Sequence, residues 1–305
     1  PPFDASAMDG YAVRAAEVSP GRPLRLAGTS QAGQRFVGMM EHGQCVRIFT
    51  GAPMPIGADA VIMQEQARAD GNLIHFETVP AAGQSLRRRG HDFQRGQELL
   101  PAGATLSPAM LGLAATANFP ALAVTRRPRI AVLATGDELV APGSTLGPDQ
   151  IVASNSYGLI PLLSPYADDI IDLGIVPDDR ARLEAALLHA FDQGVEMVVT
   201  SGGASVGDRD YVQDVLVDLG VKLDFWKLNM RPGKPLMFGT RGSTLVFGLP
   251  GNPVSAMVTA AVILRPALRQ MTGHADPFWP RLGLPLTSPL PPNGSRRHFL
   301  RGSLE

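Results

Sequence analysis

The chain has 305 residues with a net charge of −1, and glycine and proline together account for 60 of them (33 and 27). Apolar residues make up 45% and the mean hydropathy is +0.06, which excludes a disordered Gly/Pro-rich polymer, while the near-zero charge supplies no overall field that would recruit nucleic acid or an anionic membrane. One cysteine excludes a disulfide framework and fits a cytoplasmic setting, and we expect neither a signal peptide nor a membrane-spanning run.

The first 90 residues predict a β-rich N-terminal module. Residues 45–49 and 60–64 are apolar enough to form strands, and residues 72–78 alternate between apolar and polar side chains. A turn with two prolines separates the first two segments. Cys45 lies in an apolar strand, which predicts an inert core thiol.

Residues 91–127 predict a small helical linker domain. Ser107 followed by Pro108 is typical of a helix start, with Ser107 as the cap and Pro108 at the first helical position. Asn118 and Pro120 stop the helix.

Residues 128–273 predict an α/β domain with a doubly wound, mostly parallel sheet, because continuous apolar strands alternate with helices. The expected strands are 130–135, 170–176, 195–200 and 244–247. Four helices are expected, and each begins at a potential capping residue. The first begins at Asn155, the second at Asp178, the third at either Asp208 or Asp210, and the fourth at Asn252, from which it extends to about residue 271. Residues 274–305 predict the start of a C-terminal β domain that the chain truncates, and the opening at Pro1 suggests missing N-terminal residues.

Three expected strands end in loops of small and polar residues, at 135–138, 200–210 and 248–255. The carboxyl ends of parallel strands meet at one edge, where such folds bind ligands. The glycines of the second loop allow backbone N–H groups to approach an anion. Neither a Walker phosphate loop nor a dinucleotide fingerprint is present. The alternative for each loop is an ordinary tight strand-to-helix turn.

Three carboxylates, Glu138, Asp178 and Asp210, fall at these strand ends. Mg²⁺ requires only one or two protein oxygens, because water and substrate phosphates supply the rest. For Asp178 and Asp210 the alternative is a helix N-cap. The six histidines show no zinc-ligand spacing, and no Gly-x-Ser-x-Gly elbow supports a serine hydrolase.

Residues 226–235 hold Lys227, Arg231 and Lys234 on a segment stiffened by prolines. Cations held in this way favour a polyanionic ligand, and the alternative is a solvated surface strand.

The motifs together resemble those of the molybdopterin molybdenumtransferase (MoeA) family, whose eukaryotic relatives include the E domain of gephyrin. The resemblance covers essentially the whole chain. It rests on residues 4–12 (DASAMDGYA), 50–52 (TGA), 89–92 (RGHD), 135–139 (TGDEL), 201–207 (SGGASVG), 232–235 (PGKP) and 249–255 (LPGNPVS).

The resemblance implies insertion of molybdate into adenylylated molybdopterin, with release of AMP and help from Mg²⁺ or another divalent cation. It also implies a homodimer whose active site lies between the α/β domain of one subunit and the N-terminal domains of the other. Molybdopterin adenylyltransferase would be the upstream partner, and neither nucleic acid nor a membrane is expected.

The same resemblance assigns roles to residues of both parts of the chain. Ser201, Gly202, Gly203 and the turn Pro250, Gly251 and Asn252 would cradle the pterin and its phosphate. Lys227, Arg231 and Lys234 would neutralise phosphate and molybdate, although Arg231 stands where relatives often carry lysine, and Ser255 with Arg296 would help to hold molybdate. Glu138 and Asp210 would bind metal, and the catalytic candidates are Asp9, Asp92, Glu138, Asp178 and Asp210, with Thr50 and Arg87 as substrate-binding residues.

Two other functions stay open at the level of sequence. An adenylyltransferase using ATP would share the α/β domain, but the N-terminal module with its own motifs argues against it. The second open function is a gephyrin-like dimeric scaffold. The retained acidic residues and lysines argue against such a purely structural role.

Overall fold

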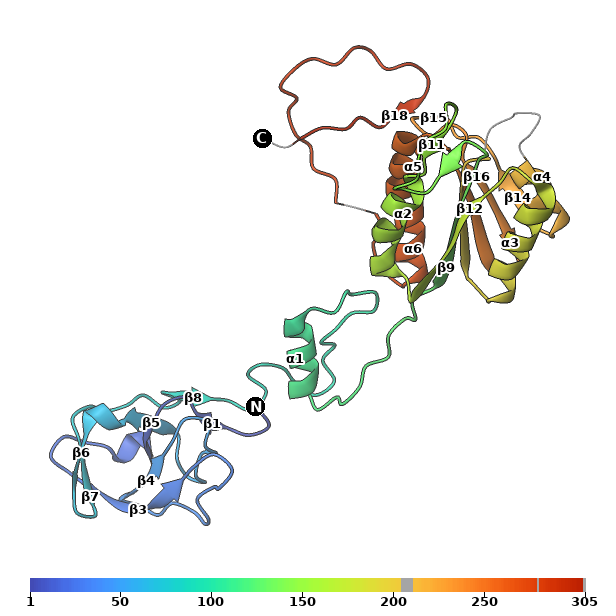
Figure 1. Ribbon diagram of the computed structural model, residues 1–305. Coiled ribbons are helices and arrows are strands. Elements are labelled where there is room, and N and C mark those ends of the chain that lie inside the picture. The colour runs from blue at the N-terminus through green and yellow to red at the C-terminus, as the bar shows by residue number, and fades with distance from the viewer. Residues whose placement is uncertain (204–210, 279, 304–305) are drawn as a thin grey trace. The chain divides into compact units, whose positions relative to one another are not determined.

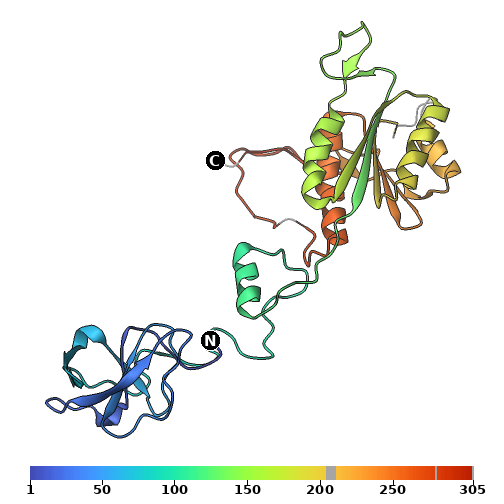
Figure 2. The ribbon, with the colours of Figure 1, turned by 60° about the horizontal axis from the view of Figure 1, so that its bottom comes forward.

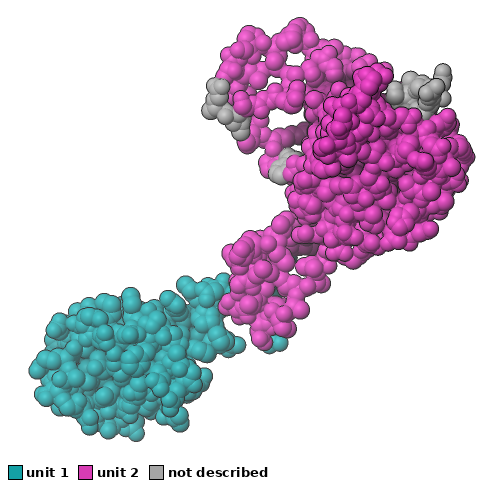
Figure 3. All heavy atoms as spheres, in the orientation of Figure 1, with its two compact units in different colours: residues 1–99 teal, residues 100–305 magenta. Residues whose placement is uncertain are grey.

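The computed structural model describes residues 1–203, 211–278 and 280–303. The chain divides into two compact units, Pro1–Leu99 and Leu100–Glu305, which Figure 3 distinguishes by colour. Asp210, one of the two predicted metal ligands, and Asp208 lie outside the described residues, as does most of the predicted 200–210 loop. Within the described residues, no helix is both long and apolar enough to cross a membrane.

Unit 1 is built on a six-stranded sheet in the order β5-β2-β4-β3-β7-β6. Only the β3–β4 pair is parallel. A short antiparallel pair, β1–β8, lies beside it, and two single-turn 3-10 helices follow β2 and β5. The elements are β1 (Ala5–Ser6), β2 (Gly10–Val13), β3 (Leu24–Ser30), β4 (Gln44–Ile48), β5 (Ala60–Met63), β6 (Ala67–Asp70), β7 (Leu73–Phe76), β8 (Leu86–Arg87), η1 (Ala15–Glu17) and η2 (Gln64–Gln66).

The central strands of unit 1 are apolar at consecutive positions because the sheet is buried on both faces. Val13 and Cys45 point into one core cluster, whereas their neighbours Ala12 and Val46 point into another. Successive side chains of a strand face opposite sides, so a strand between two cores needs apolar residues at every position. The strands predicted at 45–49, 60–64 and 72–78 are confirmed as β4, β5 and β7. Burial raises the pKa of the Cys45 thiol to about 12, in agreement with the prediction of an inert core thiol.

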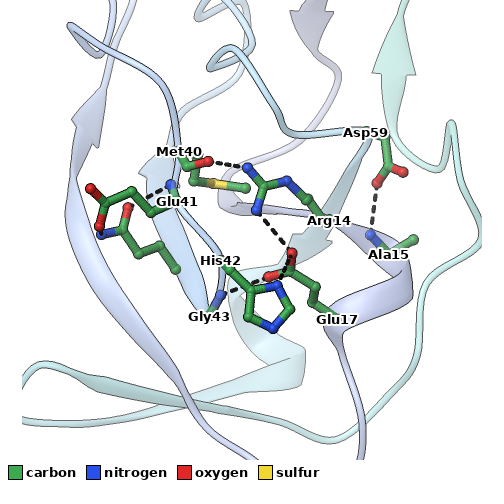
Figure 4. Close-up of polar contacts among 9 residues, drawn as sticks. Arg14, Ala15, Glu17, Met40, Glu41, His42, Gly43 and Asp59 are labelled. Atoms are coloured by element: carbon green, nitrogen blue, oxygen red, sulfur yellow. Dashed lines mark hydrogen bonds and ion pairs between the residues drawn. The ribbon is translucent and has the colours of Figure 1, made fainter.

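The turn after β2 is held by a charged network centred on Glu17 (Figure 4). Its carboxylate accepts hydrogen bonds from Arg14 Nη1, from the Gly43 N–H and from His42 Nδ1, each at 2.8 Å. Arg14 also donates to the Met40 carbonyl. Burial by itself would raise the pKa of Glu17, but the hydrogen bonds from Arg14, Gly43 and His42 outweigh it and the pKa is lowered.

We expect Glu17→Gln to destabilise unit 1 by about 2 kcal/mol, because the neutral amide gives up charge-assisted hydrogen bonds. Cys45 reports the opening of this unit, so its labelling by a thiol reagent should accelerate by roughly thirtyfold. Tryptophan fluorescence, which comes from residues outside unit 1, should stay unchanged. The folded-state pKa of Glu17 lies below its ordinary value, so its contribution is complete above that ordinary value and is lost as the pH falls. The difference between wild type and variant should therefore shrink towards pH ~3. Glu77→Gln, on the exposed surface of the same unit, is the control; equal acceleration in both variants would contradict the role of Glu17.

Unit 2 contains a six-stranded sheet in the order β12-β9-β13-β17-β16-β14 between two layers of helices (Figures 1 and 2). The first four strands are parallel, and β16 and β14 are antiparallel to their neighbours. The strands are β9 (Arg129–Thr135), β12 (Asp169–Val176), β13 (Met197–Ser201), β14 (Lys222–Phe225), β16 (Met237–Arg241) and β17 (Thr244–Leu249). The predicted doubly wound, mostly parallel α/β fold is confirmed; the two antiparallel strands were not predicted.

Helices cover both faces of this sheet. One core cluster joins the sheet to α2 (Asn155–Leu163), α5 (Pro253–Thr259) and α6 (Arg265–Met271), and a second joins it to α3 (Arg180–Asp192) and α4 (Tyr211–Asp218). The helix predicted from Asn252 to about residue 271 contains a π-helical stretch, η4 (Ala260–Leu264). Pro266 follows it and has no N–H to donate to the preceding turn, which is a common cause of such irregularity.

Shorter elements complete unit 2. The helix α1 (Pro108–Thr116) begins as predicted, since the Ser107 side chain accepts from the Met110 N–H at 3.3 Å. A parallel pair, β10 (Leu139–Val140) and β11 (Ile151–Val152), extends beyond the end of the sheet (Figure 2), and η3 (Ser164–Tyr166) follows α2. In the described part of 274–305, the one strand is β18 (Arg297–His298), which pairs with β15 (Met230–Arg231).

Candidate functional site

A cavity of about 710 Å³ opens at the carboxyl ends of β9, β13 and β17. These strands are parallel neighbours, so the loops that follow them meet at one edge of the sheet. The structure thus brings together residues from all three of the predicted loops. The residues of these loops that line the cavity are Thr135, Glu138, Ser201, Gly202, Gly203, Pro250, Gly251, Asn252 and Ser255. Asp178, which follows β12, and Asn155 line it as well.

The loops after β9 and β12 each carry one carboxylate of the cavity, Glu138 and Asp178, and the two differ in their surroundings. Glu138 is exposed, and its side chain has no hydrogen bond within the part of the chain that the structure describes. Asp178 is half-buried, and its Oδ1 accepts from the Thr135 hydroxyl at 2.8 Å. The expectation that Asp178 caps the following helix is wrong, because Asp179 accepts from the Arg182 N–H at 2.9 Å and is the cap. Asp178 therefore turns towards the strand end.

The loop after β13 begins with Ser201 and two glycines whose backbone lies in the left-handed region. Gly202 has φ +95°, and a Cβ placed on it would lie 2.3 Å from the carbonyl oxygen of Thr135. A Cβ on Gly203, at φ +64°, would lie 2.1 Å from the Val212 side chain. Only glycine permits this close approach of the loop to β9 and α4, so these glycines are required by packing as well as by the cavity.

The loop after β17 is fixed by the start of α5. The Asn252 side chain accepts from the Ser255 N–H at 3.1 Å, and Pro253 occupies the first helical position, as predicted. Pro250 is buried, whereas Gly251 and Asn252 are exposed beside the cavity. The loop therefore presents backbone atoms and a capped helix start to the cavity.

Asn155 is a site residue that sequence patterns do not reveal, because they predict it as a helix cap. The cap position is Ser154, and the Asn155 side chain makes no cap. Its Nδ2 instead donates to Ser201 Oγ at 2.7 Å and to the Gly251 carbonyl at 2.8 Å. One amide thus bridges the loops after β13 and β17. A polar residue that begins a helix opposite a strand end was the available signal.

An apolar wall is the second feature that the sequence analysis missed. Leu139, Ile151 and Val152 of the β10–β11 pair line the cavity, as do Pro235 and Pro250. Ile151 and Val152 are 57% and 39% exposed, which is high for aliphatic side chains. The cavity therefore combines an apolar wall with polar groups at the strand ends.

The predicted cations do not line this cavity. Lys227 Nζ lies 5.0 Å from the centre of the Trp226 ring, and Lys234 is exposed. Arg231 Nη2 lies 3.0 Å from His298 Nδ1, and Arg231 lines a separate cavity of about 480 Å³. Arg296 is exposed. Glu138 and Asp178 are accordingly the ionisable residues among those that line the main cavity in the described chain.

Unit 1 brings together two of its four predicted site residues. Asp9 Oδ1 accepts from the Thr50 N–H at 2.7 Å and from its hydroxyl at 2.8 Å. These two bonds hold the pKa of Asp9 below its ordinary value. Arg87 lies in β8, opposite Ala5, and Asp92 is exposed beyond that strand.

Two family models together cover most of the chain. Residues 1–118 match the MoeA N-terminal region (domain I and II). Residues 131–270 match the probable molybdopterin binding domain, which contains the cavity.

Named relatives and solved structures agree with these matches. A molybdopterin molybdenumtransferase of Haemophilus influenzae is 41% identical over 275 residues, covering 90% of this chain and 68% of the relative. One from a Nostoc species is 38% identical over 314 residues, covering 100% and 72%. A crystal structure of the molybdopterin biosynthesis protein MoeA of Pyrococcus horikoshii superposes with a TM-score of 0.76 at 31% identity, covering 90% of this chain and 69% of that one. The chain belongs to the molybdopterin molybdenumtransferase (MoeA) family.

Proposed function

We propose that this protein inserts molybdenum into molybdopterin: it takes adenylylated molybdopterin and molybdate and releases AMP and the molybdenum cofactor. The observation that carries the proposal is the cavity at the strand ends, which lies in the part of the chain that matches a molybdopterin binding domain. Its two kinds of surface suit the two parts of such a substrate. Leu139, Ile151 and Val152 can pack against a flat pterin, and the Ser201–Gly203 loop can meet its phosphate.

The charge of the cavity supports a divalent cation in this function. Glu138 and Asp178 both line it, and two carboxylates would repel an anionic substrate. Mg²⁺ binds through one or two carboxylates together with phosphates and water, and these two side chains supply such a donor set. Glu138 and Asp178 would hold the ion, which would offset phosphate charge as AMP leaves. Asp178 is kept oriented for this role by the Thr135 hydroxyl.

The other chain residues would then act by positioning and by charge. Ser201, the glycine loop and the Pro250–Asn252 turn bind the phosphorylated pterin, and Ser255 stands at the start of α5 beside them. Lys227, Arg231 and Lys234 lie on the segment before Pro235, which lines the cavity. In our proposal these cations attract phosphate and molybdate by their charge.

Release of AMP tests the function directly. The full chain is incubated with adenylylated molybdopterin, Mg²⁺ and molybdate, and AMP is quantified. We expect release that requires both molybdate and the divalent cation. Consumption of ATP with unadenylylated molybdopterin would favour an adenylyltransferase instead. Absence of both reactions would contradict the proposal and leave a scaffold as the alternative.

We further propose a cytoplasmic homodimer that receives adenylylated molybdopterin from an adenylyltransferase. In this dimer, Asp9, Thr50, Arg87 and Asp92 of one subunit complete the cavity of the other. Two observations in unit 1 support the proposal. Asp9 and Thr50 are both exposed, and the Asp9 carboxylate accepts two hydrogen bonds from Thr50, so the two residues form one polar pair at the surface.

Mixed dimers test the shared site. Asp9→Asn and Glu138→Gln should each be inactive alone. When they are mixed and allowed to exchange subunits, half of the dimers pair the two variants. Each mixed dimer then holds one intact site, so about a quarter of wild-type AMP release should return. No recovery, with subunit exchange verified by mass, would contradict a shared site.

A further inference from the structure

The side-chain amide of Asn155 joins two loops of the cavity. It lies at the start of α2, and Nδ2 reaches both Ser201 Oγ (2.7 Å) and the Gly251 carbonyl (2.8 Å). The Gly251 carbonyl can only accept, so the nitrogen of the amide, and not its oxygen, must face it. The same nitrogen therefore donates to Ser201.

This orientation decides what the Ser201 hydroxyl can do. A hydroxyl has one hydrogen to donate, and the bond from Asn155 occupies an acceptor position of Ser201 Oγ. Within the described residues, no acceptor takes the Ser201 hydrogen. Ser201 is 1% exposed and lines the cavity, so its hydrogen is left for a ligand acceptor there.

We propose that Asn155 is a positioning residue that makes Ser201 an obligate hydrogen-bond donor towards the cavity. A hydroxyl without a fixed partner can either donate a hydrogen bond to a ligand or accept one from it. A hydroxyl that already accepts a hydrogen bond from Asn155 favours ligands that present only acceptor oxygens at this point, such as a phosphate ester. The inference rests on the proposed function for the identity of the ligand, but the pairing of Asn155 with Ser201 is independent of it.

A second observation sets this amide apart from an ordinary structural contact. The Oδ1 atom of Asn155 is buried and has no donor within the described residues. A buried acceptor without a partner is destabilising, so the amide is not placed for stability alone. What Asn155 contributes at this position is the two hydrogen bonds that its Nδ2 donates, one to each loop.

A double-mutant cycle tests the proposal by measuring molybdopterin binding with isothermal titration calorimetry. Asn155→Ala should weaken binding about tenfold when Ser201 is present, because one oriented hydrogen bond to a charged group is lost. In the Ser201→Ala background the same change should weaken binding less than about twofold. If Asn155 only held Gly251 in place, the loss would be the same in both backgrounds, and that result would overturn the proposal.

Asn155→Asp supplies a second variant of nearly unchanged shape. Its carboxylate donates nothing and would accept the Ser201 hydrogen, so binding should fall with Ser201 present by more than it falls with Ser201→Ala. Repulsion of the anionic ligand is common to both backgrounds and cancels in the comparison. The control is Asn293→Ala, which removes the hydrogen bond from the Asn293 side-chain amide to the Arg296 carbonyl, far along the chain. It should leave binding unchanged. Tryptophan fluorescence verifies that each variant is folded.

The same cycle with inorganic phosphate, followed by ³¹P NMR, separates this inference from the proposed function. If the protein releases no AMP and does not bind molybdopterin, the proposed function fails. Coupling between Asn155 and Ser201 in phosphate binding would then still support the positioning role. Wild-type release of AMP together with equal losses in both backgrounds would retain the function and overturn the role of Asn155.

Discussion

Glu138→Gln should reduce molybdate-dependent AMP release by about a hundredfold or more, because the carboxylate that we propose as a metal ligand loses its charge and a bound divalent cation would contribute several kcal/mol to the reaction. The divalent cation concentration needed for half-maximal rate should rise as well. Glu138 is exposed and its side chain makes no hydrogen bond among the described residues. The free energy of unfolding should therefore change by less than about 0.5 kcal/mol. Initial rates at several Mg²⁺ concentrations, with a urea titration of each protein, measure both quantities.

The matched control is Glu184→Gln, which removes the same charge from an exposed position of α3 in the same unit. It should leave the rate and the cation dependence as in wild type. If Glu138→Gln releases AMP at the wild-type rate even when Mg²⁺ is limiting, Glu138 is not a ligand. Asp178→Asn then becomes the informative variant, since Asp178 is the other carboxylate that lines the cavity.

Gly202→Ala should destabilise unit 2 by about 3 kcal/mol and abolish AMP release. The added Cβ would lie 2.3 Å from the Thr135 carbonyl oxygen, and that oxygen belongs to the backbone of a central strand and cannot move aside. The φ of +95° adds strain that any side chain would suffer. Any relief of the contact displaces Thr135, whose hydroxyl orients Asp178, so stability and activity should fall together. Urea unfolding followed by tryptophan fluorescence gives the stability.

Gly194→Ala separates the two causes. Gly194 also has positive φ, +68°, but a Cβ there would meet no atom within 4 Å. Only backbone strain remains, and we expect a loss of about 1 kcal/mol with normal AMP release. Equal losses of unfolding free energy at the two positions would mean that the contact with Thr135 is not destabilising. The close approach of the two strand ends would then not be the reason for glycine at position 202.

Sequence patterns predicted the elements whose periodicity is strong. The buried strands β9, β13 and β17 are continuous apolar runs, and the starts of α1 and α5 carry a capping side chain followed by proline. The edge strand β14 and its neighbour β16 were not predicted, because Lys222 and Asp224 interrupt the apolar pattern of the first and Gly239 that of the second. Asp178 was assigned to capping because Asp178 and Asp179 are adjacent, and only the backbone of the turn decides which of them faces the helix.

The sequence alone determined that unit 2 would place its glycine- and proline-rich loops at one sheet edge, since parallel strands end on the same side. The resemblance of its motifs then identified the family. Tertiary structure decided which side chains meet there. Asn155 reaches Ser201 and Gly251 across 46 and 96 residues of chain, and the apolar β10–β11 pair forms one wall of the cavity. Such contacts depend on how loops pack against one another, and local sequence, which encodes periodicity and turn chemistry, carries no record of them.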